Sequence, residues 1–173
     1  SDSILGLLLY NSLNGNAGPV GFNMGGYDYH GSTTSYQYER DRSAGQSIGK
    51  VIKIALARKQ RLFLNLTTDG SVAAIPSDIP DGQLVSDRDD GLQLFAIIDP
   101  SSSFNYSQNY MIGSFNSSQE VDSSSVAHND PEKAAAIVVC NYLVFNGQDN
   151  CSAEIKNILN GNQIQQIKVI SKK

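Results

Sequence analysis

The sequence predicts a single α/β domain over residues 1–173, with a mostly parallel central sheet and helices on both faces. Two apolar runs of strand length, residues 20–24 and 61–66, stand on either side of a long helical pattern. A polar loop with acidic and hydroxyl side chains follows each run. Because ligands of open α/β sheets bind at the carboxyl ends of the strands, the pattern also predicts where a site would lie.

The composition is that of a weakly charged, folded protein. Charged residues make up 17% of the chain, against about 25% in typical soluble domains, and the net charge is −4. The sequence has no basic cluster for a nucleic acid and no apolar stretch long enough to span a bilayer. Its Ser, Asn and Gly content favours a secreted, periplasmic or cell-surface location. Because the chain begins with Ser1, we expect a processed form or a fragment of a longer protein.

The first elements are predicted to be a short helix and a buried strand. Ser3 can cap a helix through residues 4–9, although so dense an apolar run is also compatible with a strand. After a turn, the strand at residues 20–24 ends at the pair Gly25-Gly26.

A long amphipathic helix is predicted over residues 36–59, followed by a strand at 61–66. Gly45 and Gly49 lie beside the apolar stripe, so we expect the helix to pack closely on its neighbour there. Two strands joined by such a helix form a right-handed parallel crossover, which brings both polar loops to one sheet edge. The apolar stripe consists of Ala44, Ile48, Val51, Ile52 and Ala55.

The second half of the chain is predicted to hold further strands and two helices. Strands are expected at residues 92–98 and 110–115, and a terminal strand at 163–171. The triplet Asp130-Pro131-Glu132 is a strong helix start, with a cap, a first-turn proline and a first-turn acid. Ser152 is expected to cap a last, shorter helix.

Asp28, His30 and Asp69 are the main candidate site residues. Asp28 and His30 are two positions apart in an extended segment, so both can face one side. Carboxylate and imidazole ligands suit a divalent metal such as zinc, or an acid/base pair, and Asp69 could add a third ligand beside the Thr68 hydroxyl. Ordinary turn hydrogen bonds and an exposed loop histidine are the alternative interpretation.

Further residues are secondary candidates. Asp87, Asp89 and Asp90 form an acidic turn that could bind calcium, although it lacks the terminal Glu of an EF-hand and a solvated turn is favoured. His128 precedes a helix start, where a capping or surface role is favoured over catalysis.

Two cysteines and four glycosylation sequons complete the inventory of motifs. Cys140 and Cys151 either form a disulfide across a short turn or remain two buried thiols. Asn65 falls in a predicted buried strand, which would make it a poor acceptor. The sequons begin at Asn65, Asn105, Asn116 and Asn150.

The Gly-Gly-Tyr-Asp-Tyr-His loop at residues 25–30 resembles that of a group of secreted bacterial proteins related to the alkaline phosphatase and sulfatase superfamily. The Thr-Thr-Asp-Gly-Ser loop at residues 67–71 is similar to the second loop of that group. The resemblance is firmest over residues 18–74. It implies an alkaline-phosphatase-like half domain and a metal site of Asp28, His30 and Asp69, with zinc, magnesium or calcium as the ion.

The chain departs from this family at two points. Gly70 stands where a His usually follows the second Asp, and no counterpart of the first Asp and the nucleophile precedes Gly25. The chain therefore resembles the C-terminal half of a larger protein, with an N-terminal fragment as one expected partner. The leading hypothesis is a secreted protein with an incomplete phosphatase-like metal site; the alternative is a non-enzymatic extracellular structural or assembly subunit that associates with itself.

Overall fold

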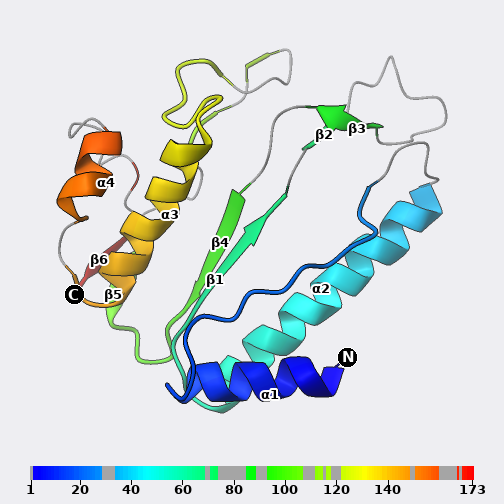
Figure 1. Cartoon of the computed structure of the whole chain (residues 1–173), viewed down its shortest axis with the longest axis vertical. Coiled ribbons are helices and arrows are strands. Elements are labelled where there is room, and N and C mark those ends of the chain that lie inside the picture. The colour runs from blue at the N-terminus through cyan, green and yellow to red at the C-terminus, as the bar shows by residue number, and fades with distance from the viewer. Residues whose placement is uncertain are drawn as a thin grey trace. The chain divides into compact units, whose positions relative to one another are not determined.

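The computed structural model describes residues 2–28, 34–68, 71–73, 85–88, 93–106, 112–114, 116–117, 122–148, 151–159, 167 and 169–173. Two compact units are distinguished, and each is described by itself. Unit 1 comprises residues 1–62, 72–88 and 96–101; unit 2 comprises residues 63–71, 89–95 and 102–173. The elements, drawn in Figure 1, are α1 (Asp2–Leu13), α2 (Thr34–Ala57), β1 (Leu62–Thr67), β2 (Ser71–Ala73), β3 (Val85–Arg88), β4 (Gln93–Ile98), β5 (Phe104–Tyr106), α3 (Pro131–Phe145), α4 (Ala153–Ile158) and β6 (Ile170–Lys172).

The predicted mostly parallel central sheet is wrong. The described strands pair only two at a time, β1 with β4, β2 with β3 and β5 with β6. The failure begins at residues 20–24, which are extended but form no strand, and where Phe22 is exposed. Gly21 interrupts this run and weakens its preference for a paired, half-buried strand. Without that strand there is no parallel crossover, and the alkaline-phosphatase-like half domain is wrong with it.

Helices α1 and α2 form the described helical part of unit 1. Their positions confirm the predicted helices at residues 4–9 and 36–59. Leu9, Val51 and Ala55 are buried, so part of the predicted stripe does pack. The close packing expected at the two glycines of α2 is wrong for the described residues, because a Cβ at either position would meet none of their atoms within 4 Å outside the neighbouring backbone of the helix.

The C-terminal ends of α1 and α2 are linked by one arginine. The guanidinium of Arg58 donates to the Asn14 side-chain oxygen at 2.7 Å. The same group lies 4.6 Å from the ring centroid of Tyr10, a favourable cation–π distance. A single long side chain thus joins the two helices through both a hydrogen bond and an aromatic contact.

Unit 2 contains most of the buried apolar side chains that the structure describes. Its helix α3 begins as predicted, because the Asp130 side chain accepts a hydrogen bond from the Lys133 amide at 2.9 Å. Helix α4 begins after Ser152, as predicted, and the Ser152 hydroxyl accepts from the Ile155 amide. The core of the unit consists of Ala136, Ile137, Cys140, Cys151, Ile155, Leu159 and Ile167.

Aromatic rings extend this core toward β1, β4 and β5. Phe63 stacks on Phe95 with ring centroids 5.5 Å apart and meets the edge of Tyr142 at 5.4 Å. Phe145 lies 5.7 Å from both Phe63 and Phe104. Offset and edge-on aromatic pairs of this kind stabilise beyond the area they bury, so the rings hold these strands of unit 2 on α3.

The strands near the C-terminus differ from those predicted. Strand β6 is short and pairs antiparallel with β5, with Asn105 opposite Ser171. The predicted strand at 163–171 is wrong at Ile167, which is helical. The described part of the predicted strand at 110–115, residues 112–114, is also not a strand. Both predictions relied on apolar runs alone, which do not identify a pairing partner.

The Asp130 cap gives the stability of the protein a defined dependence on acid. The hydrogen bond from the Lys133 backbone amide, with the Lys133 side chain at 3.1 Å, lowers the pKa of Asp130 below its ordinary value of 3.8. A carboxylate with a depressed folded-state pKa stabilises above its unfolded pKa, and that contribution disappears as the pH falls through the folded value.

We therefore expect Asp130→Asn to flatten the acid limb of the stability curve below about pH 4. Asparagine retains the capping geometry but carries no titrating charge. Urea unfolding at several pH values between neutral and strongly acidic conditions measures the effect. Asp122→Asn is the comparison variant, because Asp122 is a second carboxyl whose pKa is lowered. Equal acid sensitivity of the wild type and Asp130→Asn would contradict the role assigned to Asp130.

Candidate functional site

The glycine loop that follows residues 20–24 is held against the first turns of α2. The Tyr36 hydroxyl donates to the Gly26 carbonyl at 3.2 Å, and the Arg40 guanidinium lies 5.0 Å from the Tyr36 ring centroid. Gly26 has φ +87°, and a Cβ there would lie 3.1 Å from Arg40 Nη1. Glycine is therefore favoured at residue 26, because its φ lies in the left-handed region that other residues rarely adopt.

Of the three predicted ligands, the structure describes Asp28 alone, so their convergence stays a prediction. Asp28 is exposed and belongs to unit 1, whereas Thr68 is exposed and belongs to unit 2. His30 and Asp69 lie outside the described residues. Their predicted convergence depended on a parallel crossover between residues 20–24 and β1, and that crossover is wrong.

The metal-binding prediction needs a correction as well. Within the described ranges, no group of three or more His, Cys, Asp or Glu side chains could hold an ion. Asp87 lies in β3, and its neighbours Asp89 and Asp90 lie outside the described residues. The expected metal-binding, hydrolase-like character is therefore corrected for the part that the structure describes, which contains no metal-binding group.

Asp122 organises the segment before α3 through hydrogen bonds to serines. Its carboxylate accepts from the Ser124 amide and hydroxyl, both at 2.8 Å, and from the Ser114 hydroxyl at 3.2 Å. These hydrogen bonds lower the pKa of Asp122, and the bond from the Ser124 backbone amide has the largest effect. A carboxylate stabilised in its charged form by local donors is a turn acceptor and a weak base.

His128 lies near this turn and is partly buried. Its backbone amide donates to the Ser125 carbonyl at 3.1 Å, and Nε2 lies 3.3 Å from the Asn129 side-chain nitrogen. Nδ1 is buried without a hydrogen-bond partner. The ring therefore has a structural position in the turn, and no metal-ligating group surrounds it among the described residues.

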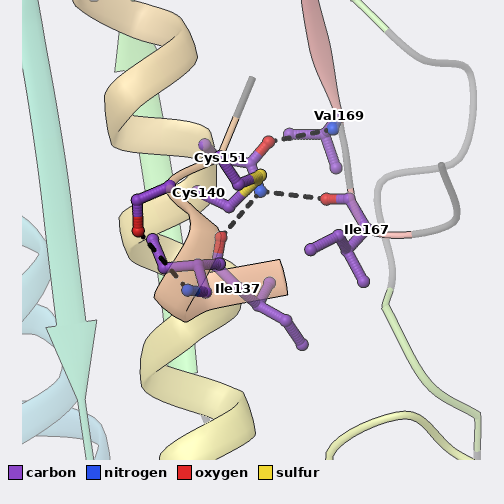
Figure 2. Close-up of a disulfide and its surroundings, with 8 residues drawn as sticks. Ile137, Cys140, Cys151, Ile167 and Val169 are labelled. Atoms are coloured by element: carbon purple, nitrogen blue, oxygen red, sulfur yellow. Dashed lines mark hydrogen bonds between the residues drawn. A yellow bond between two sulfur atoms is a disulfide. The ribbon is translucent and has the colours of Figure 1, made fainter. Parts of the chain in front are cut away.

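The two cysteines form a disulfide that joins α3 to the start of α4. Figure 2 shows the bond between Cys140 and Cys151, whose Cα atoms lie 4.9 Å apart. Both side chains are buried, with 0% and 3% exposure, and both belong to the core of unit 2. Of the two alternatives left by the sequence, the structure contains the disulfide.

Asn141 is a fully buried polar residue that the sequence analysis missed. Its amide nitrogen donates to the carbonyls of Ile137 and Ile167, each at 2.9 Å, and its oxygen accepts from the Val169 amide at 3.0 Å. Figure 2 labels the three partners, Ile137 on α3 and Ile167 and Val169 near the C-terminus. A polar residue inside the run Ala-Ile-Val-Val-Cys-Asn-Tyr was the available signal, since buried amides need partners.

The described surface of α1 is apolar and almost uncharged. Leu7, Leu8 and Tyr10 are 62%, 44% and 49% exposed, and Asp2 is the only charged residue of the helix. These exposed apolar side chains follow one another along the helix, and contiguous exposed apolar surface of this kind marks interaction sites. Helix α1 is therefore a candidate partner surface of unit 1.

Comparisons with protein families, with characterised proteins and with solved structures found no match to the chain. The resemblance at residues 25–30 and 67–71 thus remains a prediction. In the part of the chain that the structure describes, no helix combines the length and the apolar character needed to cross a membrane.

Proposed function

We propose that the chain is a non-enzymatic extracellular assembly subunit that associates with copies of itself through α1. The exposed apolar side chains of that helix carry the proposal. Leu7 and Leu8 lie next to each other in the chain, and Tyr10 follows within the same turn. Burying such side chains contributes roughly 1.5–3 kcal/mol each relative to leaving them in water.

A second copy is the partner that this surface fits best. A two-fold interface brings the same patch of both subunits together, so the patch must tolerate its own charges. Helix α1 has no basic residue and only Asp2 as an acid, but the Arg58 guanidinium lies over the Tyr10 ring, so the uncharged centre of the proposed interface is at Leu7 and Leu8. Only 17% of the residues of the protein are charged, which also limits electrostatic repulsion between two copies.

The buried disulfide supports the extracellular part of the proposal. Disulfides form and persist in oxidising compartments such as the secretory pathway, the periplasm and the cell surface. Cys140 and Cys151 are both engaged in the core, and no free cysteine remains in the chain. A buried disulfide of this kind is therefore typical of a protein that folds in an oxidising compartment.

We expect the purified wild-type chain to show reversible, concentration-dependent association by sedimentation velocity and light scattering. The double variant Leu7→Ser/Leu8→Ser should have a dissociation constant roughly tenfold higher or more, because each leucine loses apolar burial in the interface. Val139→Ser is the matched control, since Val139 is 44% exposed on α3 in unit 2, outside the proposed interface.

Circular dichroism and an intact disulfide would show that each variant is folded. A wild type that stays monomeric at its highest soluble concentration would overturn the proposal. So would equal weakening by Val139→Ser and by the leucine pair, because that result would place the interface elsewhere or indicate nonspecific association.

A further inference from the structure

The four glycosylation sequons all lie in unit 2. Asn65 belongs to the segment 63–71, and the other three sequons belong to residues 102–173. Unit 1 contains four asparagines, at residues 11, 14, 16 and 23, and none of them begins a sequon. Potential glycan acceptors are thus confined to the unit that lacks the exposed helix α1.

Asn65 has the one sequon that the structure describes at all three positions. Asn65 and Thr67 are exposed on β1, and Leu66 between them is partly buried. The sequence predicted a buried Asn65, and that prediction is wrong. Because side chains two positions apart on a strand share a face, the amide and the threonine hydroxyl are presented on the same side.

Two other sequons have exposed asparagines, but the structure does not describe all three of their residues. Asn105 on β5 and Asn116 are both exposed, whereas the third residues, Ser107 and Ser118, lie outside the described residues. Asn150 also lies outside them, and its sequon includes the buried Cys151. The argument for modification is therefore made for Asn65.

We propose that Asn65 is an N-glycosylation site, an inference that rests on the extracellular location proposed above. The donor is a lipid-pyrophosphate-linked oligosaccharide of the secretory compartment. The Asn65 side-chain nitrogen forms a bond to the anomeric carbon of the sugar while the bond from that carbon to the pyrophosphate oxygen breaks. The pyrophosphate leaves with the electron pair, and the amide nitrogen loses one proton.

An exposed acceptor on β1 can carry this group in the folded protein. A glycan is bulky and solvated, so it needs a position whose side chain reaches water. Asn65 meets that requirement, whereas Asn141 in the core does not. A glycan at this position would also increase the solubility of the protein.

The test is secretion of the full chain from insect cells behind a secretory leader. Intact mass before and after peptide-N-glycosidase F gives the number of glycans, and the enzyme converts an occupied asparagine to aspartate in the peptide that contains residue 65. We expect that conversion in the wild type. Asn65→Gln and Thr67→Ala should each remove the same single glycan, whereas Thr67→Ser, which keeps the hydroxyl of the sequon, should retain it.

Protein retained in the cells is analysed in the same way as secreted protein. An unmodified Asn65 peptide in material that carries the Cys140–Cys151 disulfide would overturn the proposal, because that material has passed through the oxidising compartment. Self-association is measured separately on unglycosylated protein from a bacterial periplasm. Failure of Asn65 occupancy and failure of α1-mediated association are therefore distinguishable results.

Discussion

Replacing both cysteines with alanine, Cys140→Ala/Cys151→Ala, should reduce the free energy of unfolding by about 3 kcal/mol. The disulfide spans a sequence separation of 11 residues. In the chain-entropy account, such a bond restricts the unfolded chain, and losing it lets the unfolded state gain conformations. A single folded domain is typically stable by only about 5–15 kcal/mol, so the loss would be a large share of the total.

The packing of the bond adds to this effect. Cys140 is fully buried and Cys151 nearly so, within the core that also contains Ile155 and Leu159. Without the covalent link, α4 is connected to α3 by noncovalent contacts, and we expect faster amide hydrogen exchange in Ala153–Ile158 than elsewhere in unit 2. Losing the disulfide should therefore raise amide exchange more in α4 than in the residues around Phe63.

Urea unfolding with and without a reductant measures the contribution of the bond. Reduced wild type and the double variant should have similar midpoints, both well below that of the oxidised wild type. A double variant within about 0.5 kcal/mol of the oxidised wild type would contradict the prediction, since surface substitutions usually fall in that range.

Local signals in the sequence identified the helices correctly. Asp130-Pro131-Glu132 combines three start signals, and the structure has the cap at Asp130 and the proline in the first turn. Ser152 caps α4 in the same way. Such signals need only neighbouring residues, because a helix satisfies its backbone hydrogen bonds within one segment.

Strand pairing depended on distant residues, and there the prediction of a mostly parallel sheet was wrong. The apolar run at 20–24 has no partner strand, so its hydrophobic character did not place it in a sheet. The proposed convergence of Asp28 with Asp69 required that pairing. The contacts of Asn141 with Ile167 and Val169 likewise join segments 26 and 28 residues apart, which no local pattern reveals.

Asn141→Leu is the second substitution with a large expected effect. Leucine is close to asparagine in size but cannot hydrogen-bond to the Ile167 carbonyl or the Val169 amide. Each of these two polar groups left without a partner costs about 1–3 kcal/mol, so we expect the free energy of unfolding to fall by about 2–6 kcal/mol. Amide exchange in β6 should also become faster, because Ile167 and Val169 lie just before this strand, Ile170–Lys172.

Asn146→Leu, at the residue that caps the C-terminal end of α3, provides a matched control. The side-chain amides of Asn141 and Asn146 both donate to the carbonyl four residues earlier, at 2.9 Å and 2.8 Å. Only Asn141 is buried and also binds the C-terminal segment, so the difference between the two variants isolates that link. Urea unfolding of both variants should show a small change for Asn146→Leu. Equal destabilisation would mean that the bond within the helix, common to both residues, accounts for the effect.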